Sequence, residues 1–64
     1  MMKEIIYIQY YKKYKKFIIR YVDNSEQVRN EVSVDDLLPH EIDFCRTAPN
    51  YYDYGDIRSW SKGR

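Results

Sequence analysis

The feature that most constrains this chain is its length of 64 residues with a single cysteine, Cys45. A domain of this size buries only about 60% of the surface that its unfolded chain exposes. Small domains usually add disulfides or a metal, but one cysteine forms no internal disulfide, and one cysteine with one histidine cannot supply four zinc ligands. We therefore expect the core to come from the eight Tyr, two Phe and one Trp, since each aromatic buries about 150–250 Å².

The chain is expected to be one small domain, residues 1–64, with residues 61–64 frayed at its end. The longest early apolar run covers residues 5–8. A secretory signal needs about 7–15 apolar residues and a membrane span about 20. A lone free thiol suits a reducing compartment. We therefore expect a cytoplasmic protein that has no membrane partner.

Charge is strongly segregated along the chain although the net charge is only +1. Residues 1–22 contain six Lys/Arg and one Glu, whereas residues 23–43 contain one Arg and seven Asp/Glu. Residues 44–64 contain four Lys/Arg and two Asp. Such segregation bears on partners and association more than on fold. An equally acceptable interpretation is that the basic and acidic blocks face each other within the domain.

Residues 4–34 predict a three-stranded antiparallel meander. The segments 4–11 and 17–22 are rich in β-branched and aromatic side chains, which fit a pleated surface. Residues 23–26, DNSE, have turn chemistry. In residues 27–34 the three valines alternate with polar residues, which indicates a half-buried strand. The turns are expected at residues 12–16 and 23–26.

A helix is the alternative for residues 7–21. Its apolar residues recur every three or four positions and would form one stripe: Tyr7, Tyr10, Tyr11, Tyr14, Phe17, Ile18 and Tyr21. The expected turn at residues 12–16 also lacks Gly, Asn and Pro. The many β-branched residues favour strands over this helix. The burial of Tyr14 distinguishes the two interpretations. In the hairpin it lies exposed at the tip, whereas in the helix it is buried in the apolar stripe.

Residues 34–47 predict a helical segment. Ser33 can cap it, and Asp35 and Asp36 follow in the first turn, where negative charge suits the helix dipole. Proline is disfavoured inside a helix but accepted at its start. We therefore expect a turn at residues 34–38, a helix that begins at Pro39, and an end at Pro49.

The expected fold class is α+β, with a three- or four-stranded antiparallel sheet covered on one face by residues 34–47. The helix is expected to bury Leu38, Ile42 and Cys45 on a shared face, with Glu41 and Arg46 pointing outward. The aromatic C-terminal segment is too apolar for an ordinary disordered tail. We expect it to fold back on the sheet, as a fourth strand or as irregular cover packed across it; the alternative is that it becomes ordered on a partner.

No group of residues predicts catalysis, a metal or a cofactor. His40 and Cys45 are five residues apart, so a helix would point them in different directions and prevent a nucleophilic pair. Asp35 and Asp36 are cap residues before they are acid-base groups. We therefore expect a protein that is not an enzyme.

The first functional hypothesis is an interaction module that binds and modulates, or inhibits, a larger protein, as a phage- or plasmid-type accessory protein would. Aromatic residues and local acidic patches are common at such interfaces. The expected contact residues are Tyr51, Tyr52, Tyr54, Trp60, Asp35, Asp36 and Glu41. A second copy of the same chain, forming a homodimer, is an alternative partner.

The alternative hypothesis is a nucleic-acid-binding protein that uses the basic-aromatic stretch at residues 10–21. Lysines attract phosphates without regard to sequence, and aromatic rings stack bases. The expected contact residues are Lys12, Lys13, Tyr14, Lys15, Lys16 and Arg20. Tyr11 and Phe17 are expected to help Tyr14 with stacking.

Overall fold

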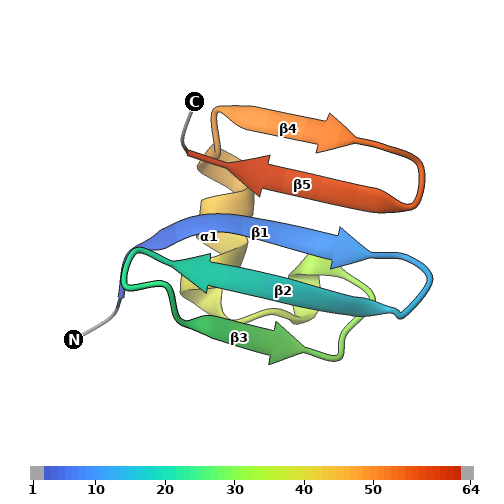
Figure 1. The fold of residues 1–64 in the computed structure, drawn as a ribbon, viewed down its shortest axis with the longest axis horizontal. Helices are drawn as coiled ribbons and strands as arrows, with labels where there is room; N and C mark the ends of the chain where they lie inside the picture. Colours follow the sequence, from blue (N-terminus) through green and yellow to red (C-terminus); the bar gives the residue numbers. More distant parts are fainter. Residues whose placement is uncertain (1–2, 63–64) are drawn as a thin grey trace.

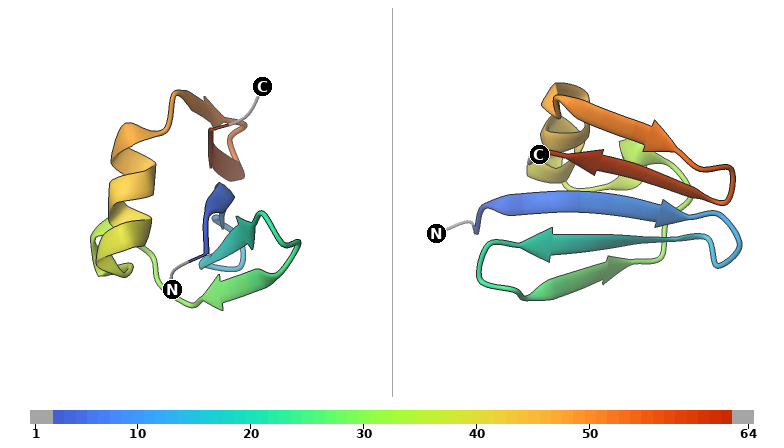
Figure 2. Two further views of the ribbon diagram at one scale, coloured as in Figure 1. Left: turned by 90° about the vertical axis from the view of Figure 1, so that its left-hand side faces the viewer. Right: turned by 45° about the horizontal axis from the view of Figure 1, so that its top comes forward.

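The computed structural model describes residues 3–62, which form one antiparallel sheet with a helical layer on one face (Figures 1 and 2). The strands are β1 (Ile5–Tyr11), β2 (Lys16–Tyr21), β3 (Glu26–Arg29), β4 (Asn50–Asp53) and β5 (Ile57–Ser61). Between β3 and β4 lie the 3₁₀ turn η1 (Val34–Asp36) and the helix α1 (Pro39–Thr47). The sheet order is β3-β2-β1-β5-β4, and every neighbouring pair is antiparallel. The α+β class is confirmed, with five strands rather than three or four.

The first hairpin confirms the strand prediction for residues 7–21 and excludes the helix. β1 and β2 pair with Ile8 opposite Ile19, and Tyr14 at the tip is 63% exposed. The turn contains no glycine, so Lys15 takes the left-handed conformation with a φ of 52°. The second turn uses Asn24 at a φ of 69°, which is the residue type expected there.

The C-terminal segment extends the sheet, so it folds back as strand, which was one of the expected outcomes, and not as irregular cover packed across the sheet; it forms two strands where one was expected. β4 and β5 form a hairpin, and β5 pairs with the free edge of β1, with Trp60 opposite Ile8. Pairing satisfies backbone groups that β1 would otherwise expose on one side. Gly55 makes the tight turn between them with a φ of 92°.

β3 is shorter than predicted and faces the opposite way. It ends at Arg29, and Val28 and Val32 are 42% and 62% exposed rather than half-buried. Arg29 instead lies opposite buried Phe17, on the sheet face that α1 covers. It points there because it binds the Glu41 carboxylate of α1.

The helical segment begins and ends as predicted, and Ile42 and Cys45 pack against the core as expected, but Leu38 and Glu41 face other ways than predicted. The Ser33 hydroxyl accepts a hydrogen bond from the Asp35 amide at 3.2 Å, and α1 starts at Pro39. Leu37 is buried, whereas Leu38 is 46% exposed. Glu41 is fully buried, so the expectation that it points outward was wrong.

Aromatic residues contribute to the core between the sheet and α1, as expected. The buried apolar residues are Ile5, Ile8, Tyr10, Phe17, Ile19 and Leu37. The ring centroid of Phe17 lies 4.6 Å from that of Tyr10 and 6.3 Å from that of half-buried Trp60. These tilted arrangements are typical of favourable aromatic pairs.

Ser61 is the last residue of β5, and the Lys62 side chain contacts Glu4 at 2.8 Å. Fraying of residues 61–64 stays a prediction, and residues 63–64 lie outside the described part of the chain. Within residues 3–62, no helix is long and apolar enough to cross a membrane.

Candidate binding surfaces

Among residues 3–62, no helix or strand covers the sheet face opposite α1 (Figure 2), and we call it the open face. Ile8 and Tyr10 of β1 are buried beneath α1. Successive strand residues point to opposite sides of a sheet, so Tyr7, Gln9 and Tyr11 of β1 lie on the open face. β1 is the central strand, so these side chains occupy the middle of that face.

A hollow of about 270 Å³ lies on the open face between β1 and β2. Its lining residues are Tyr7, Gln9, Tyr11, Tyr14, Lys16, Ile18 and Glu26. The Tyr11 hydroxyl donates a hydrogen bond of 3.1 Å to the Oε1 atom of Gln9, which fixes both side chains. Neither Tyr7 nor Gln9 was predicted as a contact residue. The strand prediction for residues 7–11 could have identified them, because strand alternation assigns residues 7, 9 and 11 to one face.

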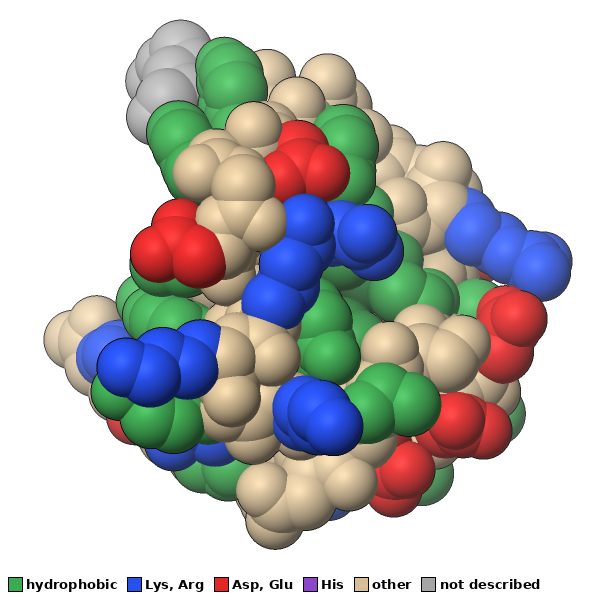
Figure 3. Space-filling view, turned by 90° about the vertical axis from the view of Figure 1, so that its right-hand side faces the viewer, with side chains coloured by type: hydrophobic (Ala, Val, Ile, Leu, Met, Phe, Trp, Pro, Cys, Tyr) green, Lys and Arg blue, Asp and Glu red, His purple; other side chains and the backbone are tan. Residues whose placement is uncertain are grey.

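Lysines gather at the β1–β2 turn, which borders this hollow. Figure 3 shows this end of the molecule, where Lys and Arg side chains cluster and acidic side chains lie around them. The Nζ atoms of Lys13 and Lys16 each lie 5.6 Å from the centroid of the Tyr14 ring. Within residues 3–62, neither of these lysines nor Lys15 has a carboxylate partner.

The other two basic residues of the predicted nucleic-acid set are paired with acids. The Lys12 Nζ atom lies 3.5 Å from an Asp53 carboxylate oxygen. An Arg20 nitrogen donates to Glu26 at 2.5 Å, and a second one donates to the Asn24 carbonyl at 3.1 Å. The free cationic groups of the set are therefore Lys13, Lys15 and Lys16. Phe17 was also expected to stack bases, but it is buried in the core.

The four C-terminal aromatics divide between the two faces of the sheet. Tyr52 pairs with Ser59, which pairs with Gln9, so Tyr52 lies on the open face. Its ring stacks on that of Tyr54 at 6.0 Å, and both are more than half exposed. Tyr51 packs against Trp60 at 5.3 Å on the other face.

The acidic residues predicted to share a contact surface with these aromatics lie elsewhere. Asp35 and Asp36 are exposed in η1, which lies behind β1 and β2 in Figure 1, on the same side of the sheet as α1, whereas Tyr52 lies on the open face. Glu41 is enclosed between α1 and β3, so it contacts no partner in this conformation. The predicted protein-binding residues therefore do not form one continuous surface.

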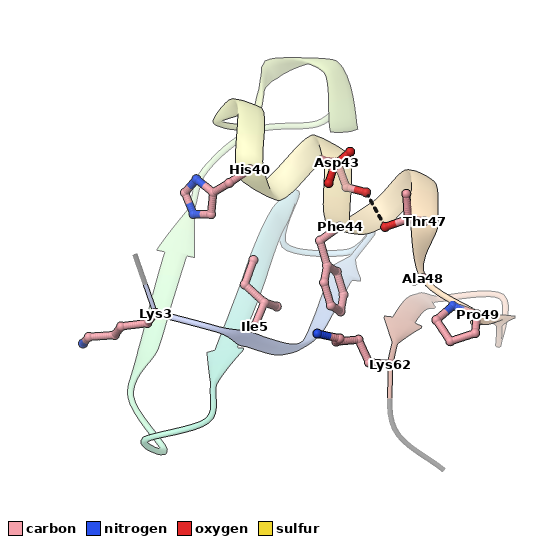
Figure 4. Close-up of a pocket in the computed structure, with 9 residues that line it drawn as sticks. All are labelled: Lys3, Ile5, His40, Asp43, Phe44, Thr47, Ala48, Pro49 and Lys62. Carbon is pink, nitrogen blue, oxygen red and sulfur yellow. Dashed lines mark hydrogen bonds between the residues drawn. The ribbon is translucent and has the colours of Figure 1, made fainter. Parts of the chain in front are cut away.

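A second hollow, of about 330 Å³, lies beside α1 at the end where β1 begins (Figure 4). Ile5, Phe44 and Pro49 supply apolar lining, and Lys3 and Lys62 lie at its edge. Both lysines are already paired, with Asp23 and Glu4 respectively. The hollow therefore combines an apolar surface with two neutralised lysines, and His40 and Asp43 complete its lining.

The ionisable residues of α1 are unsuited to nucleophilic or metal chemistry. Burial, and then the nearby Glu41 carboxylate, raise the pKa of the Cys45 thiol to about 12. A thiol with such a pKa stays protonated and unreactive. In the part of the chain that the structure describes, no group of three His, Cys, Asp or Glu residues is placed to hold a metal ion.

Comparison with known proteins adds no relative: no family model, curated protein or solved structure matches the chain.

Proposed function

We propose that the protein is a non-enzymatic nucleic-acid-binding protein, and that it binds through the end of the open face around the β1–β2 turn. The observation that supports this is the group of three lysines without carboxylate partners among residues 3–62, Lys13, Lys15 and Lys16, at the turn that carries Tyr14; Lys13 and Lys16 lie against the Tyr14 ring. Lysines supply attraction to phosphates, and tyrosine rings supply surfaces for bases. The net charge of +1 limits this to a local patch.

The number of unpaired lysines in the patch, which consists of Lys13, Lys15 and Lys16, determines how strongly the binding constant should depend on salt. Neutralising three phosphates gives a slope of log K against log salt of about −2 on a single strand and about −2.7 on a duplex. Raising the salt from about 50 to 200 mM should therefore weaken single-strand binding about 20-fold. A protein that used all the basic residues of residues 10–21 would give a steeper slope.

Fluorescence anisotropy of labelled oligonucleotides at several salt concentrations tests the proposal. The triple variant Lys13→Gln, Lys15→Gln and Lys16→Gln should lose most of the binding and most of the slope. The matched control replaces Lys3 and Lys62, which are paired with acids and lie away from the patch. The proposal fails if the wild type does not bind at low salt, or if the triple variant binds as tightly as the wild type.

A second candidate function is the interaction module that modulates a larger protein, and the edge strand β4 favours it. The Tyr54 amide donates to the Ile57 carbonyl at 2.8 Å, which makes these residues a hydrogen-bonded pair. Such pairs alternate along an antiparallel ladder, so the backbone groups of Tyr51 and Asp53 face outward. The exposed Tyr51 and Tyr52 side chains flank this free edge.

This candidate is tested with Tyr51→Pro, which removes an outward amide but keeps the bonds to β5. The matched control is Tyr51→Val, which keeps the amide. Pull-down from lysate of the source cells, followed by sedimentation, should show a captured protein or a dimer that Tyr51→Pro abolishes and Tyr51→Val retains. Equal capture by both variants, or a monomer that captures nothing, would exclude β4 as the contact.

A further inference from the structure

We infer that the hollow between β1 and β2 holds an unpaired base, so that the ligand is a single strand rather than a duplex. This inference rests on the proposed function and adds the class of nucleic acid to it. It is carried by the aromatic walls of the hollow, Tyr7, Tyr11 and Tyr14, and by its size of about 270 Å³. The lysines argue only for phosphate and would serve a duplex equally well.

The shape of the site suits a single unpaired base better than a duplex. Gln9 and Ile18 form a cross-strand pair on neighbouring strands. Together they line the hollow between the tyrosine rings, where Ile18 is apolar and Gln9 supplies an amide. Tyr11 pairs with Lys16 across the same strands, so a ring and a cation lie side by side. A base on these rings would bring its own phosphate to the lysines. In a duplex the bases are stacked on each other and their faces do not reach a protein ring.

Gln9 adds a preference among bases. Its Oε1 atom already accepts the Tyr11 hydroxyl hydrogen at 3.1 Å, so the side chain offers its amide N–H groups as donors. Thymine and uracil present two carbonyl acceptors, whereas adenine places its amino donor beside the ring-nitrogen acceptors N1 and N7, where that donor would face the amide N–H groups of Gln9. The site should therefore bind oligothymidine more tightly than oligoadenosine of equal length.

The first experiment separates stacking from phosphate attraction. Three probes of equal length are titrated at one salt concentration: an oligothymidine, the same strand with abasic residues, and a duplex of mixed sequence. The oligothymidine should bind roughly 5- to 150-fold more tightly than the abasic strand, the range expected for one stacked base. It should also bind more tightly than the duplex, although the duplex carries more charge.

The second experiment assigns the effect to residues. Tyr14→Leu is expected to fold normally, because Tyr14 is 63% exposed at a turn. It should lower oligothymidine binding toward the level of the abasic strand while leaving abasic binding unchanged. Tyr51→Leu removes an equally accessible tyrosine from the other face and should change neither. Gln9→Leu should abolish the preference for thymidine over adenosine.

Different results would contradict the proposed nucleic-acid binding and the assignment of an unpaired base to this hollow. If the abasic strand and the duplex bind as tightly as the oligothymidine, with a normal salt slope, the inference is overturned while the proposed function stands. If no probe shows salt-dependent binding, both are overturned. If Tyr51→Leu matches Tyr14→Leu, the base lies elsewhere on the molecule and the inference about this hollow is wrong.

Discussion

The buried ion pair between Arg29 and Glu41 is the contact whose loss should affect stability most. Arg29 Nε lies 3.2 Å and 3.1 Å from the two carboxylate oxygens of Glu41, and Nη2 lies 2.8 Å from Oε2. Oε1 also accepts a hydrogen bond of 2.9 Å from the Leu38 amide at the start of α1. The pair therefore joins β3, which is an edge strand, to the helix.

The two partners should respond unequally when one is removed. Glu41 is fully buried, whereas the Arg29 side chain is 26% exposed. Arg29→Met leaves a buried charge with one remaining donor and should cost about 3–5 kcal/mol. Glu41→Leu leaves a cation that water can reach, so it should cost less, about 1.5–3 kcal/mol. In the Glu41→Leu background, Arg29→Met should cost almost nothing, which gives a coupling energy of about 3–5 kcal/mol.

Urea unfolding followed by the fluorescence of Trp60, the only tryptophan, measures all four proteins of this cycle. A domain of this length has a total stability of about 3–10 kcal/mol, so Arg29→Met should leave it close to unfolding. Its melting temperature should fall by about 12–40 °C. If Arg29→Met costs the same with and without Glu41, the two side chains are not coupled and the reasoning is wrong.

Three further predictions concern single residues. Lys15→Gly should stabilise the domain by about 0.5–1 kcal/mol in urea unfolding, because glycine accepts the left-handed turn conformation without strain; a loss of stability would contradict this. Cys45 should react with a thiol reagent at pH 8 only when the domain unfolds, and, because its raised pKa of about 12 favours the folded thiol, stability should fall as the pH rises above about 9. Hydrogen bonds from Ser25 hold the pKa of Asp23 at about 2 instead of 3.8, so its stabilising contribution is complete above pH 4 and lost as the pH falls toward 2. Thermal melts of Asp23→Ala should show a smaller loss over that interval than the wild type.

Local chemistry was sufficient to predict the elements whose signals lie within a few residues. Asn24 marked the second turn because it tolerates a positive φ. Ser33 and Pro39 marked the cap of η1 and the start of α1 because each satisfies a requirement of a helix terminus. The first hairpin was predicted from β-branched and aromatic residues although its turn lacks the usual residues.

Long-range pairing could not be predicted in the same way. Alternation assigned Val28 to the core and Arg29 to solvent, and the structure reverses this because Arg29 meets Glu41 across 12 positions of sequence. The same pairing buries a glutamate that looked like an ordinary helix surface residue. Likewise, nothing near Trp60 indicates that β5 joins β1, since the pairing depends on which strand edge is left free. The candidate hollow is lined by residues of β1, β2 and their turn and by Glu26 of β3, and its lining was only partly predicted.

The conformation of Lys15 supports the view that the β1–β2 turn was selected for its charge. A left-handed conformation costs a lysine roughly 1–2 kcal/mol, and glycine or asparagine would avoid most of that cost. Natural sequences break local rules of this kind mainly at sites with a function. The neighbouring lysines, Lys13 and Lys16, are also unpaired with acids although Asp53 pairs with Lys12 close by. A turn that served only to join two strands would need neither feature, so both favour a role in binding an anionic partner.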